Sequence, residues 1–366
     1  MRNYVLLYLL SLLYAPALMS SMIVRDVPNI HQIRECLLRN TNLSEALFTI
    51  IFAYMNEYFI RTTLNRPLVS SNHPMTPSAA AFSPDGQWLA TGTYHGLVRI
   101  WDPDGIEKQS LDAHPAPIRS LAYSPDSRLL ATASDDKTVG IWESKSRSKL
   151  AILQGHESHL NSIAFSPEGG HLITASDDET IRLWDVTTAQ NITQFGHHTD
   201  WVCSASFNPK DGQQFVSGGN DAMVHIWDIR SKNTIHTISE HRNNVNTASF
   251  SPDGKEVVTA SDDKTVGMWS AKSGNIRRRF TLSDEVRTAY FNNDGDQILI
   301  ATDSKNAYIV GAAEGDWIQT LDTHAKPTHS AVFSATAQHI VTVNYDYALL
   351  WSSLYKAHQK SKIALF

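Results

Sequence analysis

The stretch 155–185, GHESHLNSIAFSPEGGHLITASDDETIRLWD, decides the fold. Apolar and polar residues alternate in it over residues 160–165, 171–176 and 180–184. Such alternation predicts three short β-strands, because successive side chains of a strand point to opposite faces of a sheet. A turn with the sequence SPEG at 166–169 separates the first two strands, and its glycine tolerates a positive φ. The stretch therefore predicts an antiparallel meander.

This pattern recurs at a fixed period through residues 73–366. Tryptophans follow one another in steps of 41, 42, 43 and 42 residues and then of 82, which is twice 41, and a histidine precedes each by 27 to 29 residues. Val310 and Leu282 stand in the slots of the one missing tryptophan and histidine, so the stretch holds seven units of about 42 residues. The tryptophans are Trp101, Trp142, Trp184, Trp227, Trp269 and Trp351, and the histidines are His73, His114, His156, His198, His241 and His324.

Each unit is expected to form a four-stranded sheet, because a further short strand precedes each histidine, as at 149–153 and 191–195. One such unit cannot bury both faces of its sheet, so neighbouring units must stack, and a ring of seven removes the exposed ends. Small residues recur in the first strand of every unit, as suits sheets that converge on an axis. They are Ala79, Ser120, Ser162, Ser204, Thr247, Thr288 and Ser330.

Two units contain both a Gly-His pair and a Trp-Asp pair, at 155–156 with 184–185 and at 196–198 with 227–228. With this spacing the sequence resembles the WD-repeat (WD40) family of β-propellers. The resemblance covers about four fifths of the chain. It implies an all-β, seven-bladed propeller over residues 66–366, in which a hydrogen-bonded tetrad of His, Ser or Thr, Asp and Trp pins each blade. The matching tetrads are His114, Thr132, Asp136 and Trp142; His156, Thr174, Asp178 and Trp184; His198, Ser217, Asp221 and Trp227; His241, Thr259, Asp263 and Trp269; and His324, Thr342, Asp346 and Trp351.

Two units depart from the tetrad. In the first, His73, Thr91 and Trp101 match, but His95 replaces the aspartate. A partly satisfied buried network costs about 1 to 3 kcal/mol for each unpaired polar group, so a complete replacement is favoured over a partial one. The sixth unit is therefore expected to be a degenerate blade, and its four positions hold Leu282, Ile300, Ser304 and Val310.

The first 65 residues differ in composition from the repeats. Residues 1–22 combine one charge, Arg2, with an apolar run and an Ala-Pro-Ala site, which predicts a secretory signal that is removed after residue 17. The alternatives are a buried apolar helix in a cytoplasmic protein, or a retained membrane anchor. Residues 23–65 are expected to be a short α-helical segment. Within it, residues 43–55 faintly resemble the start of an F-box, the segment that docks substrate receptors of ubiquitin ligases, which export would contradict.

The composition narrows the classes of partner. The chain has 31 basic and 37 acidic residues and a formal net charge of −6, so it offers no basic field for nucleic acid or an anionic membrane. Membrane association is expected only if the N-terminal apolar run stays as an anchor. Cys36 and Cys203 are too few for a disulfide framework or a zinc knuckle.

Signatures of catalytic chemistry are missing. The chain contains no phosphate-binding, dinucleotide-binding, zinc-protease or serine-hydrolase motif. Six of its 16 histidines occupy tetrad positions and the other ten show no ligand spacing, so no metal and no cofactor are expected.

The resemblance implies a binding face instead. The residue before each tetrad aspartate is expected beside the mouth of the central channel, where the histidine-bearing loops gather. Four of these residues are aspartates, and the tetrads are expected to engage the neighbours Asp136, Asp178 and Asp263, so the four carboxylates should be free to meet a ligand. The alternative is that paired aspartates only stabilise the turn between the second and third strands. The predicted partner-binding residues are Tyr94, Asp135, Asp177, Trp201, Asn220, Asp262, Asp303 and Tyr345.

The function expected from these features is a non-enzymatic scaffold that binds a protein or peptide partner with a basic segment. The alternatives are a propeller-based hydrolase or lyase with catalytic groups at the same mouth, and an F-box-like substrate receptor. The strand that closes the ring is expected from residues 67–71, with residues 362–366 as the competing candidate.

Overall fold

The computed structural model describes residues 66–67, 77–304, 306–322, 327–336, 339–344, 346 and 348–352. The predicted signal, the helical segment with its F-box-like run, and the residues His73, His324 and Tyr345 lie outside this part of the chain. Among the described residues, no helix is long and apolar enough to cross a membrane.

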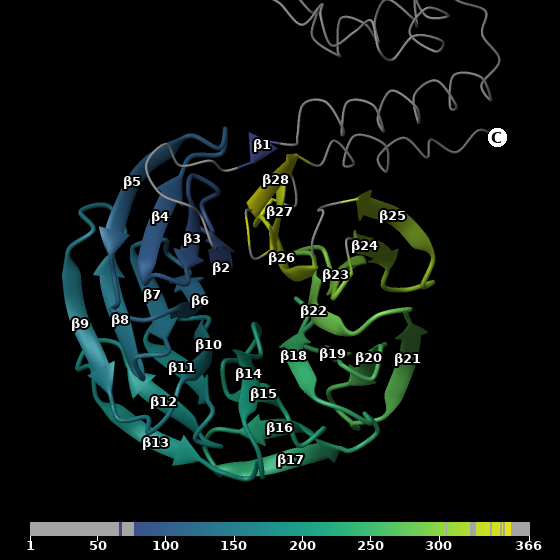
Figure 1. Cartoon of the computed structure of the whole chain (residues 1–366). Coiled ribbons are helices and arrows are strands. Elements are labelled where there is room, and N and C mark those ends of the chain that lie inside the picture. Colours follow the sequence, from purple (N-terminus) through teal and green to yellow (C-terminus); the bar gives the residue numbers. More distant parts are fainter. Residues whose placement is uncertain are drawn as a thin grey trace, which may run out of the picture. The chain divides into compact units, whose positions relative to one another are not determined.

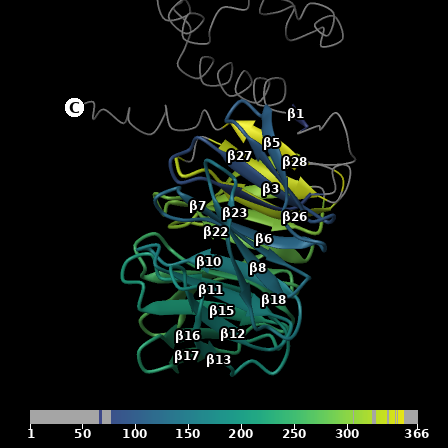
Figure 2. The same ribbon diagram turned by 90° about the vertical axis from the view of Figure 1, so that its left-hand side faces the viewer.

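Seven four-stranded antiparallel sheets, the blades, follow one another around an axis (Figure 1). In the side view of Figure 2, the strands run from one face of this ring to the other. Because neighbouring strands are antiparallel, the turn between the second and third strands of a blade lies at the same end as the loop into its first strand. We call this end the loop face. The all-β, seven-bladed prediction is confirmed.

The strands of each blade are numbered from the axis outward. Blades 1 to 3 consist of β2 (Pro77–Phe82), β3 (Leu89–Thr93), β4 (Leu97–Trp101) and β5 (Glu107–Asp112); β6 (Ile118–Tyr123), β7 (Leu129–Ser134), β8 (Thr138–Glu143) and β9 (Lys149–Gln154); and β10 (Leu160–Phe165), β11 (His171–Ser176), β12 (Ile181–Asp185) and β13 (Asn191–Phe195). Blades 4 and 5 consist of β14 (Val202–Phe207), β15 (Gln214–Gly219), β16 (Val224–Asp228) and β17 (Asn233–Ile238); and β18 (Val245–Phe250), β19 (Glu256–Ser261), β20 (Thr265–Ser270) and β21 (Ile276–Thr281). Blades 6 and 7 consist of β22 (Val286–Phe291), β23 (Gln297–Thr302), β24 (Asn306–Gly311) and β25 (Trp317–Asp322); and β26 (Thr328–Phe333), β27 (His339–Asn344), β28 (Ala348–Ser352) and β1 (Arg66–Pro67).

The hydrophobic core lies between the blades. Each of seven clusters of buried residues joins two adjacent sheets, including one cluster that joins blade 7 to blade 1. Between blades 3 and 4, for example, Trp227 packs against Phe195 and stacks on Phe215. A blade therefore buries its apolar faces only in the company of both neighbours.

The small residues of the first strands also form polar seams between blades. In five successive interfaces the hydroxyl accepts a hydrogen bond from a backbone N–H of the next first strand, at 2.9 to 3.4 Å. The accepting residues are Ser120, Ser162, Ser204, Thr247 and Thr288. A first strand has a free edge toward the axis, and these hydroxyls satisfy backbone groups that no fifth strand can reach.

The chain closes its own ring. β1 pairs antiparallel with β28, with Arg66 opposite Leu350 and Pro67 opposite Leu349. The amino-terminal candidate therefore supplies the outer strand of blade 7, one residue earlier than expected, while residues 68–71 and 362–366 lie outside the described part. A proline is tolerated there because an outer strand has one unpaired edge.

Blade 6 is a complete sheet with an apolar centre. Ile300 and Val310 are fully buried and belong to one cluster, against which Leu282 packs. Ser304, at the position of the aspartate, shares a hydrogen bond of 2.7 Å with the Thr302 hydroxyl. Apolar contacts thus stand where the other blades have a polar network.

Candidate functional site

The tetrads hold the loop face together. In blade 3 the Trp184 indole N–H donates to Thr174 Oγ1 at 2.9 Å, and the Thr174 hydroxyl meets Nε2 of His156 at 2.7 Å. On its other side His156 Nδ1 lies 2.7 Å from Asp178. A neutral His156 satisfies both of its neighbours when Nδ1 carries the proton and donates to Asp178, while the Thr174 hydroxyl donates to Nε2. The loop into the first strand is thereby tied to the second and third strands.

The same arrangement occurs in blades 2, 4 and 5. The distances between Nδ1 and the carboxylate are 2.8 to 2.9 Å, and those between Nε2 and the hydroxyl are 2.7 to 2.8 Å. In blades 1 and 7 the structure describes the inner half of the network, in which Trp101 donates to Thr91 and Trp351 donates to Thr342, both at 2.9 Å.

The tetrad aspartates have depressed pKa values. Burial opposes the charged form of Asp263, but hydrogen bonds from Thr265 and His241 outweigh burial and lower its pKa to about 2. Burial also opposes the charged form of Asp178, but hydrogen bonds from His156 and Thr180 hold its pKa far below the ordinary value. All four aspartates of blades 2 to 5 therefore stabilise the fold in their ionised form.

We expect the free energy of unfolding to fall as the pH drops from about 4 to about 2. A carboxyl whose folded pKa lies below its unfolded value of about 3.9 stabilises the protein above that value, and this contribution is lost on the way down to the folded pKa. Asp263→Asn should be less stable than wild type at pH 7 and less sensitive to acid in this window. Urea unfolding at several pH values measures both effects. Parallel stability curves for the two proteins would contradict this assignment.

The second residue of every first strand occupies a β-bulge. The register of the first strand shifts at this residue in all seven blades. A bulge leaves the extra residue unpaired and redirects its side chain. The bulged residues are Ser78, Arg119, Asn161, Cys203, Asn246, Arg287 and His329.

Bulged residues reach the predicted positions beside the mouth of the central channel, which we call the rim. The expectation that the four rim carboxylates are free is therefore wrong. Arg119 binds Asp135 through two parallel hydrogen bonds of 2.7 and 2.8 Å. Arg287 lies 3.0 Å from both Asp262 and Asp303, and so bridges blades 5 and 6. These arginines were not predicted from the sequence, because only the bulge turns them toward the rim, where they meet an aspartate sixteen positions downstream and, for Arg287, also Asp262 of the preceding blade.

Among the described residues, Asp177 is the rim aspartate that has no ion pair or hydrogen bond with an arginine, although the more distant charge of Arg119 acts to lower its pKa. Its carboxylate accepts a hydrogen bond of 2.6 Å from the Asn161 amide, and His159 Nδ1 lies 3.6 Å away. Burial raises its pKa above the ordinary value, against the effect of the bond from Asn161. This carboxylate is therefore poorly compensated in its charged form.

Hydrogen bonds of Asn161 connect this carboxylate to the backbone beside Trp201. Asn161 donates to Asp177 and also, at 3.0 Å, to the carbonyl of Val202, which directly follows Trp201. The Trp201 carbonyl in turn accepts from the backbone of Asn220, at 2.9 Å. Its side chain is 52% exposed. An exposed aromatic residue and an undercompensated carboxylate thus belong to neighbouring blades 3 and 4 at one face.

The other predicted rim residues have defined contacts. The Arg119 guanidinium lies over the Tyr94 ring, 5.7 Å from its centroid. Asn220 accepts a hydrogen bond of 3.1 Å from the Cys203 thiol. Burial raises the pKa of Cys203 to about 12, so it is a protonated thiol in a structural contact rather than a nucleophile.

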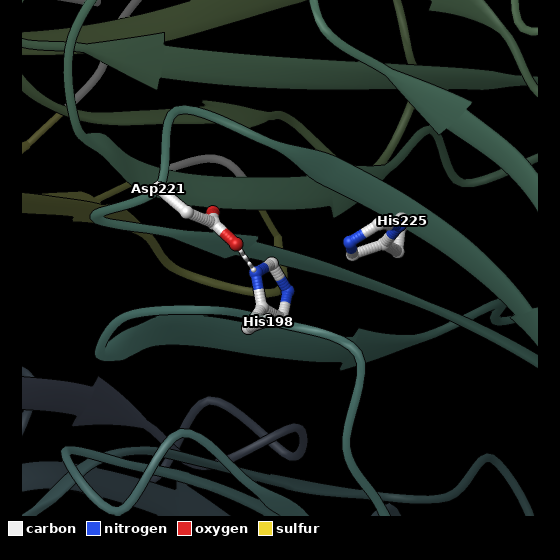
Figure 3. Close-up of side chains that lie close together, drawn as sticks. All are labelled: His198, Asp221 and His225. Carbon is white, nitrogen blue, oxygen red and sulfur yellow. Dashed lines mark hydrogen bonds and ion pairs between the residues drawn. The ribbon is translucent and has the colours of Figure 1, made fainter.

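Blade 4 brings together a cluster that was not predicted from the sequence (Figure 3). Ligand atoms of His198, Asp221 and His225 all lie within 4.8 Å of one another. Burial, with a contribution from His198, lowers the pKa of His225 to about 4, so its imidazole is neutral. The sequence offered one signal for this cluster. His225 lies two positions before Trp227, and at the equivalent position the other blades carry Arg, Gly, Tyr or Leu.

The fold and this face define a WD-repeat type of propeller whose loop face is held by His-Ser/Thr-Asp-Trp tetrads. The family model described as "WD domain, G-beta repeat" matches residues 67–102, 105–143, 147–185, 189–228 and 232–270, which is more than half of the chain. The chain therefore belongs to the WD40 family. No curated protein matches it. Each matched segment contains the outer strand of one blade and the inner three of the next, so the first match includes Pro67 of β1.

Proposed function

We propose that the protein is a non-enzymatic interaction scaffold that binds a peptide or protein partner on the loop face. The observation that carries the proposal is that exposed Trp201 and Asp177 lie at one face of neighbouring blades, connected through Asn161, and that among the described residues no arginine forms an ion pair or hydrogen bond with Asp177. An aromatic body beside a carboxylate suits a lysine or arginine side chain, which offers an apolar stem and a cationic end.

The charge of the rim supports a basic partner. Arg287 also forms an ion pair of 3.0 Å with its neighbour Glu285. In these described contacts, the carboxylates of Asp135, Asp177, Asp262, Asp303 and Glu285 outnumber the two guanidinium groups of Arg119 and Arg287. An excess of one sign at a single face attracts a partner of the opposite sign. The predicted partner with a basic segment therefore stands as a proposal, with the Asp177 region as its centre.

Peptide selection tests this proposal directly. We expect peptides selected from a random displayed library on the full chain to be enriched in lysine or arginine. Trp201→Ala and Asp177→Asn should each weaken their binding by roughly tenfold, since aromatic and charged anchors dominate interface energies. Asparagine retains the oxygen that accepts from Asn161, so the fold should be preserved. Fluorescence anisotropy of single labelled peptides at two salt concentrations measures the effect, which should be larger at low salt.

Matched controls lie elsewhere on the ring. Trp317 on β25 is 53% exposed, like Trp201, and Asp104 is exposed in the turn between β4 and β5, at the opposite face. Trp317→Ala and Asp104→Asn should leave binding unchanged. The proposal fails if selected peptides bind the Trp201 and Asp177 variants as tightly as wild type. Export through residues 1–22 stays a prediction from the sequence. The F-box-like receptor and the propeller-based hydrolase or lyase stay alternatives that no contact among the described residues supports.

A further inference from the structure

We infer that blade 4 contains a site for a zinc-class divalent metal ion, formed by His198, Asp221 and His225. Two imidazoles and one carboxylate are a ligand set that suits Zn²⁺ and neighbouring transition metals. The site is separate from the proposed partner-binding residues, and it distinguishes blade 4 from the otherwise similar blades 2, 3 and 5.

His225 is the residue that points to a ligand. Its side chain is buried, with 6% exposure, and its Nε2 has no hydrogen-bond partner. Its Nδ1 lies 3.0 Å from the Thr237 hydroxyl, which fixes the orientation of the ring. A buried ring nitrogen without a partner costs about 1 to 3 kcal/mol unless something binds it. An oriented second nitrogen is also what metal-bound histidines characteristically have.

The His225 ring lies beside the His198–Asp221 pair (Figure 3). The two imidazole centroids are 4.6 Å apart, and the three ligand atoms fall within 4.8 Å of one another. Tetrahedral coordination at about 2.0 to 2.2 Å requires ligand atoms roughly 3.3 Å apart. Binding therefore needs the most distant pair of ligand atoms to close by about 1.5 Å at most, and His198 Nδ1 and the Asp221 carboxylate, which are 2.9 Å apart, to open by about 0.4 Å.

Asp221 has an acceptor capacity that its counterparts lack. In blades 2, 3 and 5 a threonine two positions after the aspartate donates to it at 2.6 to 2.7 Å. Blade 4 has Met223 at this position, and only its backbone N–H reaches Asp221, at 3.0 Å. The carboxylate of Asp221 has therefore lost a hydroxyl donor in the same blade in which a histidine with an unpartnered nitrogen has appeared.

The ion would take the place of the hydrogen bond between His198 and Asp221. The carboxylate of Asp221 is 2.9 Å from His198 Nδ1, which carries a hydrogen in the tetrad. For the ion to bind between these two atoms, the ring proton of His198 moves from Nδ1 to Nε2, which then donates to the Ser217 oxygen at the same 2.8 Å contact, so His198 stays neutral and no proton is released. His225 Nε2 supplies the third ligand and a water the fourth. The tetrad remains connected, with the metal in place of one hydrogen bond.

Titration of the purified full chain with Zn²⁺ alone, against a chromophoric chelator, tests the site. We expect one ion per chain for wild type. His225→Gln keeps a polar side chain near Thr237 and should weaken binding at least roughly tenfold. Met223→Thr removes no ligand, but it restores the competing hydroxyl donor and should also weaken binding. His197→Gln, which alters the exposed neighbouring histidine, is the matched control and should bind like wild type.

Cobalt substitution provides a test that needs no variant. Co²⁺ in this site should give the intense visible absorption of a four-coordinate ion with nitrogen and oxygen ligands. Weak octahedral absorption in wild type would overturn the inference. So would equal Zn²⁺ affinity of wild type and His225→Gln, because the ion would then be held by other histidines.

Discussion

Thr174→Val is expected to lower the free energy of unfolding by roughly 2 to 5 kcal/mol. The Thr174 hydroxyl is fully buried and is the partner of both the Trp184 indole and the His156 ring. Valine preserves the volume but leaves two buried polar groups unpaired, at about 1 to 3 kcal/mol each. Urea unfolding monitored by tryptophan fluorescence gives the change directly.

Two control variants separate the hydroxyl from packing. Thr174→Ser should be much milder, because Ser217 performs the same role in blade 4 with a distance of 2.8 Å to His198. Ile300→Val in blade 6 alters an equivalent but apolar position and should cost only about 0.5 to 1.5 kcal/mol. A Thr174→Val protein no less stable than Thr174→Ser would show that the tetrad contributes little.

Deletion of residues 1–72 is expected to lower the thermal midpoint by roughly 5 to 10 °C relative to deletion of residues 1–65. Both deletions remove the same amino-terminal segment, but only the longer one removes β1 at Arg66–Pro67 and its pairing with β28. An unpaired β28 exposes the backbone N–H and C=O groups of its outer edge, and the strand pairing that joins the beginning of the propeller to its last blade is lost.

Differential scanning calorimetry of the two deletion proteins measures the difference. The pair of deletions cancels any contribution of residues 1–65. Equal midpoints would mean that β1 does not close the ring energetically, and the competing segment 362–366 would then be the next to delete. Size-exclusion chromatography provides a second measurement, because an open β28 edge should promote association between chains.

The sequence predicted the ring and most of its tetrads because each 42-residue unit encodes them locally. The alternation of apolar residues sets the strands, and the spacing of histidine, threonine, aspartate and tryptophan follows from the strand lengths in one meander. Even the degenerate blade was predicted, since Leu282, Ile300 and Val310 had replaced the polar residues together.

The candidate binding face was predicted only in outline. The rim positions follow from the repeat, but their electrostatic state does not. Arg119 and Arg287 contact rim aspartates because each lies in a β-bulge, which redirects its side chain. The alternation of apolar and polar residues does not predict where a bulge occurs. The bulged residue sixteen positions upstream is an arginine for Asp135 and an asparagine for Asp177. Asp262 also has an asparagine there, but Arg287 of the next blade pairs with it, so the charge of the rim depends on contacts within a blade and between blades.

By itself, then, the sequence determined the number of blades, the tetrads and the face on which the histidine-bearing loops gather, because these features repeat within one contiguous unit. The tertiary structure decided which rim charges are compensated and that His225 lies beside His198 and Asp221. The physical reason is that strand register and bulges, set by packing between neighbouring sheets, determine where a side chain points. A periodic sequence specifies the strands, and only their packing specifies the contacts between them.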